Sequence, residues 1–502
     1  MGTRYILLLS LLCFALWGKA QTDTEFWFAV PEVSWRHVDP EPTYVHIAAL
    51  DAAATVTIDM PQNATFAPTT FTIPANGAER LDLTWYVRTG YGAPPFDILN
   101  NAPTGTHDDN NIIESGLVGD EGNIENRGIR ITSTSLITAY LERNATNNPD
   151  IWALKGKNAL GTDFYVPSQN FWNNQPFSAP EALNAIDIVA TEDTWVYFAP
   201  TAAVKNIGPG AANHSIVYSK YLLKGQSISL VATDEAAGAH LGGTHVWSDG
   251  KIAVSWKDDS VRSKLGGCYD LMGDQMIPTD LAGNEYVVMR GQLTTNREYV
   301  FIMSLSNGTI VDLADPDGLA TGSITLGAPG SISRILLNNK NGTVNDPVPA
   351  NPNGVIDALH LKSPNKEPFI VFHVTGFGCE MGTAVLPTIK GCTGSTEVSF
   401  QRSTSEGFFL NIMTKQAHID DFFITINGTN YPIPGGWFTE IPGTGVDASS
   451  DWWYLDKTYN NFGAAHTVGT HGAAIPAVVT GAVTKVYNTT GIFHLGLING
   501  GG

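Results

Sequence analysis

Cysteine, positive charge and long apolar runs are all scarce in this 502-residue chain. It has four cysteines, and 28 Lys and Arg stand against 48 Asp and Glu, so the formal net charge is −20. Nucleic acids and anionic membranes need a basic surface, so this balance argues against both as partners. After the N-terminal segment, no apolar run approaches the roughly 18 residues of a membrane-spanning helix. We therefore expect no transmembrane segment.

The sequence motifs of common catalytic sites are also missing. No His-Glu-x-x-His or Cys-x-x-Cys pair supports a zinc enzyme. No Gly-x-Ser-x-Gly turn and no phosphate-binding glycine loop occurs. A glycosidase needs only two carboxylates, which can lie far apart in the sequence, and 48 acidic residues make chance pairs certain. We therefore expect no enzyme, no catalytic residues and no required cofactor, and we keep a glycan-active hydrolase as an alternative.

The first 20 residues have the features of a signal peptide. Arg4 supplies a positive start, residues 5–17 form an apolar run, and the small residues Gly18 and Ala20 suit cleavage. The mature chain is therefore expected to be secreted or to lie at the cell surface. There the oxidising environment favours disulfides.

Three cysteines remain after cleavage of such a peptide: Cys268, Cys379 and Cys392. A bridge between Cys379 and Cys392 would close a short loop and stabilise the fold by about 3 kcal/mol in the chain-entropy model. That pairing leaves Cys268 either as a free buried thiol or with a partner outside this chain. The other pairings stay open, because spacing does not show which side chains face each other.

One supersecondary pattern recurs along the chain in a fixed order, which indicates stacked copies of one unit. Each copy opens on a similar segment and continues with two short apolar runs split by Asp, Asn or Gly, a pattern typical of hairpins. A glycine-centred turn and a closing pair of strands follow. The opening segments are 22–31, 160–167 and 283–288; the apolar runs are 44–50 with 55–58, 185–190 with 195–198, and 299–303 with 309–311.

The later parts of the pattern recur equally regularly. The glycine-centred segments are 73–77, 223–230 and 328–332; the closing pairs are 128–131 with 137–140, 245–247 with 252–256, and 359–361 with 369–372; a partial fourth copy runs through 408–412, 422–426 and 493–497. Apolar and polar residues alternate in 252–256, which is the period of a strand with one buried face.

These repeats predict an all-β fold of tandem β-sandwich-like units, three complete and one partial. The step between Gly161 and Gly283 suits a sandwich of about 100 residues. A β-propeller-like arrangement is the alternative, although one blade takes only about 40–50 residues. We predict a signal peptide at 1–20, repeats at 21–160, 161–282 and 283–395, and a partial repeat, truncated at its C-terminus, at 396–502.

Two groups of residues are candidates for binding. Asp312, Asp315 and Asp317 place three carboxylates in one turn, and calcium prefers oxygen ligands of this kind. Turn geometry explains the same residues without a metal. Three tryptophans in Gly- and Asp-rich segments are candidate contacts for a sugar or a protein partner, with core packing as the alternative. They are Trp437, Trp452 and Trp453.

Several segments resemble the N-terminal domain of the IgGFc-binding-protein family. They are residues 266–278, 283–288, 374–387 and 392–395. The chain is more similar to a bacterial branch of this family, found on large exported proteins of Bacteroidota. The resemblance implies an extracellular binding or adhesion module and supplies no catalytic residues. Such relatives continue past the 493–497 strand into a segment with a cysteine, so we expect this chain to be a fragment.

We therefore expect a secreted or cell-surface, non-enzymatic module that binds an extracellular protein or glycan. A structural spacer in a longer surface fibre is the second alternative, beside the hydrolase. Calcium is the only cofactor that the residues suggest.

Overall fold

The computed structural model describes most of residues 22–499, and its regular structure is almost entirely β, as predicted. The described residues are 22–34, 42–86, 112–145, 148–176, 181–262, 269–293, 298–314, 322–337, 356–378, 380–390, 393–402, 407–446, 450–463 and 475–499. The predicted signal peptide lies outside them. None of the helices in these ranges has the length and hydropathy of a membrane span.

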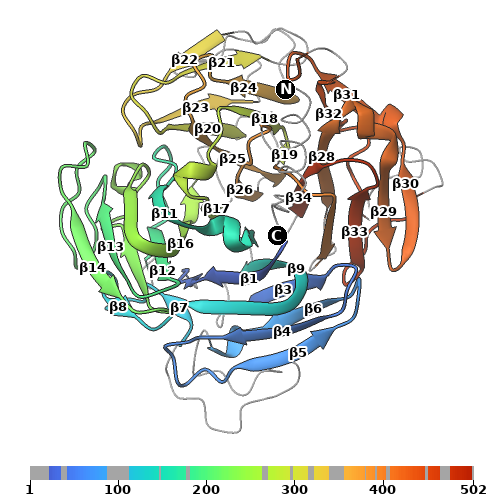
Figure 1. Cartoon of the computed structure of the whole chain (residues 1–502). Coiled ribbons are helices and arrows are strands. Elements are labelled where there is room, and N and C mark those ends of the chain that lie inside the picture. The colour runs from blue at the N-terminus through green and yellow to red at the C-terminus, as the bar shows by residue number, and fades with distance from the viewer. Residues whose placement is uncertain are drawn as a thin grey trace, which may run out of the picture.

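Four units surround one central axis (Figure 1). Unit 1 contains β1 (Asp23–Phe28), β2 (Val30–Pro31), β3 (Thr43–Ala49), β4 (Ala54–Asp59), β5 (Thr69–Ile73), β6 (Ala78–Asp82), η1 (Thr84–Tyr86), β7 (Glu114–Ser115), β8 (Ile124–Glu125), β9 (Ile129–Ala145) and β10 (Asn148–Leu154). Unit 2 contains η2 (Gly156–Ala159), β11 (Leu160–Tyr165), β12 (Asn184–Ala190), β13 (Thr194–Ala199), β14 (Tyr218–Leu222), β15 (Ser227–Val231), η3 (Ala237–Ala239), β16 (His245–Arg262) and β17 (Tyr269–Gln275).

The other two units complete the ring. Unit 3 contains η4 (Thr279–Leu281), β18 (Glu285–Met289), β19 (Gln292–Leu293), β20 (Tyr299–Ser304), β21 (Ile310–Ala314), β22 (Gly322–Thr325), β23 (Ile332–Leu336), β24 (Ala358–Lys362), β25 (Phe369–Gly378) and β26 (Glu380–Val385). Unit 4 contains β27 (Glu397–Gln401), β28 (Phe408–Lys415), η5 (Gln416–Asp421), β29 (Phe422–Ile426), β30 (Thr429–Ile433), η6 (Gly435–Trp437), β31 (Phe438–Ile441), β32 (Trp452–Leu455), β33 (Val483–Asn488) and β34 (Phe493–Asn499).

Units 1 to 3 are pairs of sheets with the same strand order, and unit 4 shares this order in its outer sheet, which confirms the sandwich-like arrangement. The outer sheets are β1-β9-β4-β5, β11-β16-β13-β14, β18-β24-β21-β22 and β27-β33-β29-β30. The inner sheets are β10-β9-β3-β6, β17-β16-β12-β15, β26-β25-β20-β23 and, in unit 4, β34-β28-β32-β31. The units surround one axis as propeller blades do, but each is a two-sheet sandwich and not a single sheet.

The closing strand pair expected in units 1 and 2 is in fact one long strand. β9 and β16 each run through both sheets of their unit, pairing with outer strands in their first half and inner strands in their second. In β16 the predicted turn at Asp249 and Gly250 is an irregularity within the strand: residues 248–251 lie opposite the single residue Thr162 of β11, and the strand changes partner there from β13 to β12. In unit 3 the two strands are separate, with Lys366 at a φ of 63° between them.

The predicted glycine-centred segments are tight turns. Asn76, Gly225 and Gly330 occupy matching places before β6, β15 and β23, with φ values of 56°, 86° and 84°. L-residues other than Asn and Asp rarely adopt such values, so the residue types at these three positions follow from the turn.

Apolar contacts join each unit to the next and close the ring. Between units 2 and 3, Trp256 meets Phe372 edge to face with ring centroids 5.9 Å apart, in a core to which both units contribute. Between units 4 and 1, Thr138 Oγ1 donates to the Ser399 carbonyl at 2.6 Å. A cluster of Trp27, Ala29, Val189 and Ala253 joins units 1 and 2, and Val287, Ala358, Met413, Ile441 and Trp452 join units 3 and 4.

Two features bear on how the chain is divided. β8 lies in the first stretch of chain but pairs with β15 of unit 2, so units 1 and 2 are interlocked. At the axis, β10 contacts β17 and β17 contacts β26. The predicted domain boundaries at 160, 282 and 395 stay predictions.

Candidate binding surface

An aromatic row crosses the solvent-facing side of the outer sheet of unit 2. The alternation of β strands places one set of side chains in the core and the other outside. The outward set forms the row in three cross-strand pairs, in the strand order β14, β13, β16 and β11 (left-hand unit in Figure 1). The pairs are Tyr221 with Trp195, Tyr197 with Trp247, and His245 with Tyr165.

The rings stack on one another along the row. The centroids of Tyr165 and His245 are 4.3 Å apart with the rings 5° from parallel. His245 and Trp247 stack at 4.5 Å, and Tyr197 stacks on Trp247 at 5.6 Å. Aromatic cross-strand pairs of this kind stabilise a sheet by about 0.2–1 kcal/mol each. The row is therefore a rigid surface that loses little side-chain entropy when a ligand binds.

Stacking also decides which parts of the rings a ligand can reach. In the middle of the row each ring face covers another ring face, so the accessible parts are ring edges. At one end, Trp195 and Tyr221 are each 45 % exposed and meet edge to face at 5.5 Å. A sugar ring stacks on an open aromatic face, whereas a protein surface packs against edges and protruding rings equally well. The geometry thus favours a protein ligand.

Hydrogen bonds hold the other end of the row in place. His245 Nε2 lies 3.1 Å from Asp163 Oδ2, and Thr279 donates to Asp163 Oδ1 at 2.9 Å. Burial alone would raise the pKa of Asp163, but the bonds from His245 and Thr279 outweigh it and lower that pKa. The carboxylate is therefore charged at neutral pH and fixes the orientation of the imidazole.

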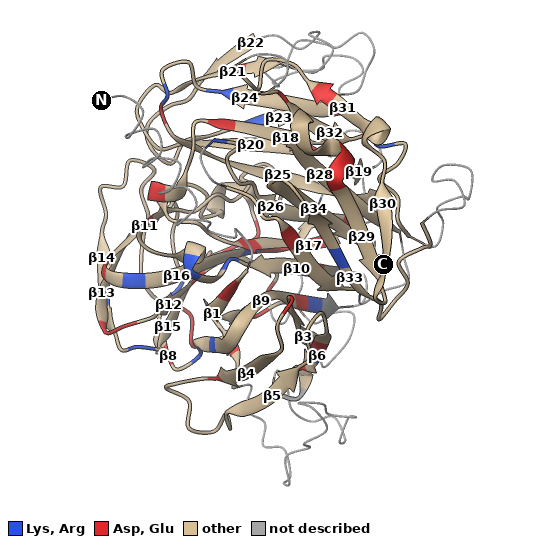
Figure 2. Cartoon of the chain, turned by 45° about the vertical axis from the view of Figure 1, so that its right-hand side comes forward, with Lys and Arg blue, Asp and Glu red and all other residues tan. Residues whose placement is uncertain are grey.

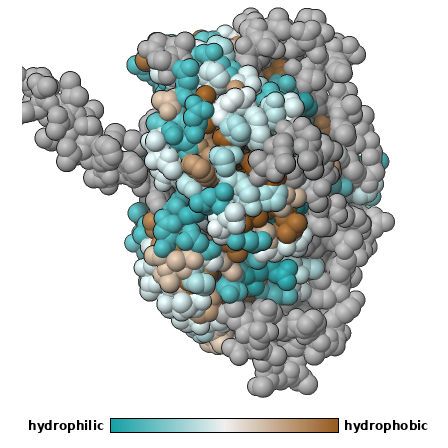
Figure 3. All heavy atoms as spheres, turned by 90° about the vertical axis from the view of Figure 1, so that its right-hand side faces the viewer, coloured by the Kyte–Doolittle hydropathy of each residue, from teal (hydrophilic) through white to brown (hydrophobic). Residues whose placement is uncertain are grey.

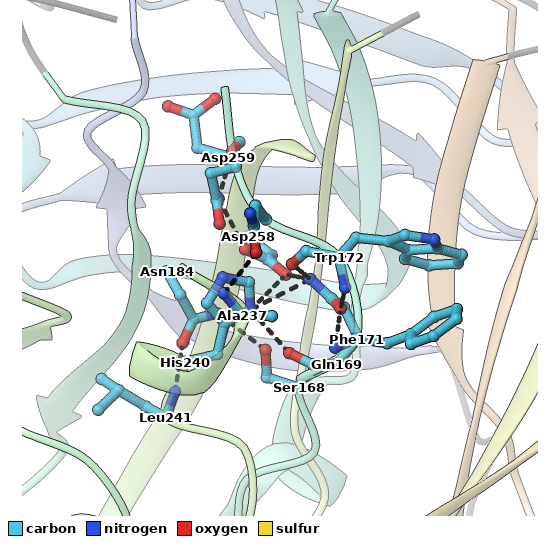
Figure 4. A network of polar contacts seen from close by, with 12 residues as sticks. Ser168, Gln169, Phe171, Trp172, Asn184, Ala237, His240, Leu241, Asp258 and Asp259 are labelled. Carbon is cyan, nitrogen blue, oxygen red and sulfur yellow. Dashed lines mark hydrogen bonds and ion pairs between the residues drawn. The ribbon is translucent and has the colours of Figure 1, made fainter. Parts of the chain in front are cut away.

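A buried polar network lies inside unit 2, around the inner-sheet half of β16 (Figure 4). Asp258 accepts hydrogen bonds from Gln169 Nε2 at 2.7 Å and from Asn174 Nδ2 at 2.9 Å. Gln169 Oε1 in turn accepts the backbone N–H groups of Phe171 and Trp172, both at 2.7 Å. His240 Nδ1 lies 3.4 Å from Asp258, but both side chains are 0 % exposed. No substrate can reach this His–Asp pair. The hydrogen bonds of Asp258 to Gln169 and Asn174 show that the pair holds the 168–174 loop in place.

A groove of about 230 Å³ lies at the axis of the ring, between β10, β26 and β34; we call it the central groove. Its wall includes the carboxylates Asp150 and Asp274. Asp150 accepts from Ile151 N at 2.9 Å and from Trp152 Nε1 at 2.6 Å, and burial raises the pKa of Asp150 well above its usual value.

Asp274 is bonded to the chain in the same way as Asp150, and the wall of the groove also carries Glu380 and Glu142, of which Glu142 is bonded to His46. Asp274 Oδ1 accepts from Lys155 Nζ at 2.6 Å, and Oδ2 accepts from Val385 N at 2.7 Å. All four oxygens of Asp150 and Asp274 are thus bonded to the chain itself. Such carboxylates are built into the fold, and neither is placed to act as a nucleophile or as a general acid.

Comparison with known proteins supplies the family. Residues 153–432, more than half of the chain, match the family described as IgGFc binding protein. The chain belongs to this family. The matched region contains all of unit 2, and hence the whole aromatic row, together with all of unit 3 and the start of unit 4. No curated protein matches the chain.

Solved structures add little to this family assignment. Two forms of arabinofuranosyltransferase AftD from Mycobacteria, one of them a mutant, share 9% and 10% sequence identity with the chain. Both alignments cover 94% of this chain, with TM-scores of 0.11 and 0.12. In the same order, the chain spans 40% and 33% of the lengths of those two proteins. Scores this low carry no argument about fold or function.

The three tryptophans proposed from the sequence lie in unit 4, away from the aromatic row. Trp437 is half-buried and stacks on Tyr459 at 5.0 Å. Trp452 is 2 % exposed, within the contact between units 3 and 4, and Trp453 packs partly buried against the unit 4 core. Their role in ligand contact stays a prediction.

The proposed calcium and disulfide residues are mostly outside the described part of the chain. Asp315, Asp317, Cys379 and Cys392 all lie there. Asp312 is described, in β21, where its Oδ1 accepts from Ser323 Oγ at 2.5 Å. Within the described ranges no group of three or more His, Cys, Asp or Glu side chains is arranged to hold a metal. The calcium site and the disulfide stay predictions.

Sequence reasoning missed the aromatic row, although its signal is present. Trp195 and Tyr197, and likewise His245 and Trp247, are separated by one residue and so share a face of their strand. The sequence does not state which strands are neighbours, and the pairing of β13 with both β14 and β16 is what assembles the row.

Proposed function

We propose that this chain is a secreted or cell-surface, non-enzymatic module that binds an extracellular protein through the aromatic row. The observation that carries the proposal is the row itself: four stacked rings on one sheet, with Trp195 and Tyr221 protruding beside them at one end and meeting edge to face. Trp and Tyr are over-represented among the residues that dominate protein–protein binding energy. Membership of a family of binding domains supports the same function.

The charge distribution and the buried carboxylates fit this function. Lys and Arg positions are scattered along the ribbon and do not gather in one part of this view among the described residues (Figure 2). The −20 net charge therefore disfavours nucleic acid and anionic membrane as ligands. In the central groove, Asp150 and Asp274 are bonded to the chain, which disfavours a glycan hydrolase.

The proposal includes three finer statements taken from the resemblance. The chain comes from an exported surface protein of the bacterial branch of the family, in Bacteroidota. Residues 1–20 direct its export. Its ligand is an extracellular protein, and immunoglobulin Fc is the first candidate to test, since the family name refers to it.

The test is a binding screen with purified residues 21–502 against immunoglobulins, mucins, other extracellular proteins and a glycan panel. The matched variants are Trp195→Ala with Tyr221→Ala, and Val479→Ala as the control. Val479 is 51 % exposed in unit 4, so its truncation removes an exposed apolar side chain far from the row. Binding of a protein that the row variant loses and the control keeps would support the proposal. Binding only to glycans, or equal binding by both variants, would refute it.

A further inference from the structure

The aromatic row of unit 2 occupies positions that unit 1 fills with threonine. The hairpins β4-β5 and β13-β14 lie at the same edge of their outer sheets, and buried residues alternate with exposed or half-buried ones in both. The solvent-facing pairs are Trp195 with Tyr221 and Tyr197 with Ser219 in unit 2, and Thr55 with Thr72 and Thr57 with Thr70 in unit 1. The sandwich therefore does not require aromatic rings at these positions.

The rings of the row carry polar groups that are free to bond to a ligand. They are the indole N–H groups of Trp195 and Trp247 and the hydroxyls of Tyr165, Tyr197 and Tyr221. None of these five groups forms a hydrogen bond within the described part of the chain, and all five residues are exposed or half-buried. An indole N–H can only donate, and a tyrosine hydroxyl can donate or accept.

Acceptors are scarcer than donors along the row. The carboxylate of Asp163 already accepts from Thr279 and lies 3.1 Å from His245 Nε2. The backbone groups of β13 and β16 pair with strands on both sides, in the plane of the sheet. Among the described residues of the row, this leaves the other ring nitrogen of His245 and the hydroxyl oxygens as acceptors. A ligand that brings acceptors and few donors therefore fits the row best.

A proline-rich segment in the polyproline II conformation has these properties. Proline has no backbone N–H, and a polyproline II helix has no internal hydrogen bonds, so its backbone brings carbonyl acceptors and few donors. Its apolar rings pack against aromatic side chains, and its stiffness reduces the conformational entropy that is lost on binding.

The length of the row also suits such a segment. From Tyr165 in β11 to Tyr221 in β14, the row crosses three strand spacings and advances four residues along the strands. At about 4.8 Å per strand and about 3.4 Å per residue, this diagonal is about 20 Å long. A polyproline II helix rises about 3.1 Å per residue, so about six or seven residues cover the row.

Other ligand backbones fit the row less well. A β-strand lying across the sheet brings N–H groups, for which the row has few acceptors. An α-helix pairs its own backbone groups, so it would exclude water from the indole and hydroxyl groups without replacing the lost bonds. Pairing of a strand with the edge of β14 is disfavoured by Lys220, which shares the inward side with the buried Leu222, because inward-pointing charges block edge pairing.

We propose that the aromatic row binds a proline-rich segment of an extracellular protein in the polyproline II conformation. The segment lies diagonally across β11, β16, β13 and β14. Its rings pack beside Trp195 and Tyr221, and its carbonyl groups accept hydrogen bonds from the indole and hydroxyl groups. The proposal rests on the proposed function, because it names the chemistry of the protein ligand at the same surface.

The probe is fluorescein-labelled nonaproline, which is long enough to cover the row. Its matched control has glycine in place of every second proline, so it keeps the length but adds N–H groups and loses the stiff conformation. Fluorescence anisotropy measures binding to residues 21–502, and NMR follows the indole N–H signals of Trp195 and Trp247. We expect saturable binding of nonaproline, at least ~10-fold weaker binding of the control, and shifts of both indole signals.

Three variants of the chain connect binding to the row. The double variant Trp195→Thr, Tyr221→Thr copies the threonine pair of unit 1 and should weaken binding at least ~10-fold. Trp195→Phe keeps a ring but removes the N–H donor, and should weaken binding about two- to tenfold. On the outer side of unit 4, hydrophobic and hydrophilic atoms are mixed (Figure 3). Val479→Ala, also in unit 4, is the control and should change binding less than about twofold.

Several results would overturn the proposal. They are no binding of nonaproline, equal binding of nonaproline and its control, unchanged indole signals, or equal binding by the threonine variant and the unaltered chain. If the threonine variant does not fold, Trp195→Phe and the indole signals decide.

The same measurements separate this proposal from the proposed function. A protein from the screen that needs the row but is not displaced by nonaproline would overturn the polyproline proposal and leave the proposed function intact. Row-dependent binding of nonaproline, with no protein binding in the screen, would support the polyproline proposal while the screen failed to support the proposed function.

Discussion

Leu141 and Leu497 occupy matching places in units 1 and 4. The loss of unfolding free energy when each is truncated to alanine shows how completely its core is closed to solvent. Leu141 pairs with Val45 and is 1 % exposed. Leu497 pairs with Leu410 and is half-buried. A truncation in a closed core loses the transfer free energy of the removed carbons and also leaves a cavity.

The exposure of each leucine predicts how much unfolding free energy its truncation removes. For Leu141→Ala, the range measured for buried leucines predicts a loss of about 3–4 kcal/mol in the free energy of unfolding. For Leu497→Ala, three carbons at about 0.8 kcal/mol each, half removed from water, give about 1.2 kcal/mol. Because the site opens to solvent, no cavity term is added. The difference between the variants is therefore about 2–3 kcal/mol.

The assay is guanidinium unfolding followed by tryptophan fluorescence, with native-state hydrogen exchange to resolve units 1 and 4. Hydrogen exchange is needed because a chain of this size need not unfold in one step. Equal losses in the two variants would refute the reasoning, since they would mean that the unit 4 core is as closed as that of unit 1.

Three further predictions concern pH, backbone strain and the aromatic row. Burial raises the pKa of Glu125 from 4.5 to about 8, so the folded state holds this proton more tightly than the unfolded state. The proton on Glu125 stabilises the fold fully below pH 4.5, and this contribution is lost as the pH rises to 8. Thermal scans should therefore give a lower Tm at pH 8 than at pH 5, and the difference should be smaller in Glu125→Gln. Gly243→Ala should lower the free energy of unfolding by about 2–4 kcal/mol in chemical denaturation. Gly243 has a φ of +87°, and an added Cβ would lie 2.3 Å from the Gly330 carbonyl oxygen of unit 3. Gly238→Ala is the control and should be neutral, because its Cβ would have nothing within 4 Å. Trp195→Ala should lower stability by about 1.5–2.5 kcal/mol, half of the range for fully buried Phe and Trp, because the side chain is 45 % exposed. A loss of about 4 kcal/mol or more in the same denaturation assay would mean that the row is mainly structural.

Much of the fold was predictable because its signals are local. The opening segments, the hairpins and the turns at Asn76, Gly225 and Gly330 depend on residues that are close in sequence. The shared strand order follows from copying one such unit. The long strands β9 and β16 were misjudged, because Ser, Thr and Asp-Gly residues that usually mark a turn here continue an extended strand through both sheets.

The candidate sites were less predictable because they depend on distant pairings. The aromatic row exists only because β13 lies between β14 and β16, and the central groove only because units 1, 3 and 4 meet at the axis. Composition drew attention to the tryptophans of unit 4, of which Trp452 is a core residue. No local pattern distinguishes it from Trp195, which is exposed.

The most direct test of the account is the affinity of a protein ligand from the screen for the Trp195→Ala, Tyr221→Ala variant relative to Val479→Ala. If the aromatic row is the binding surface, the double variant should bind at least ~30-fold more weakly, since a single dominant contact contributes about 2 kcal/mol or more. Val479→Ala should bind like the unaltered chain. Equal affinity of the two variants would contradict the central claim.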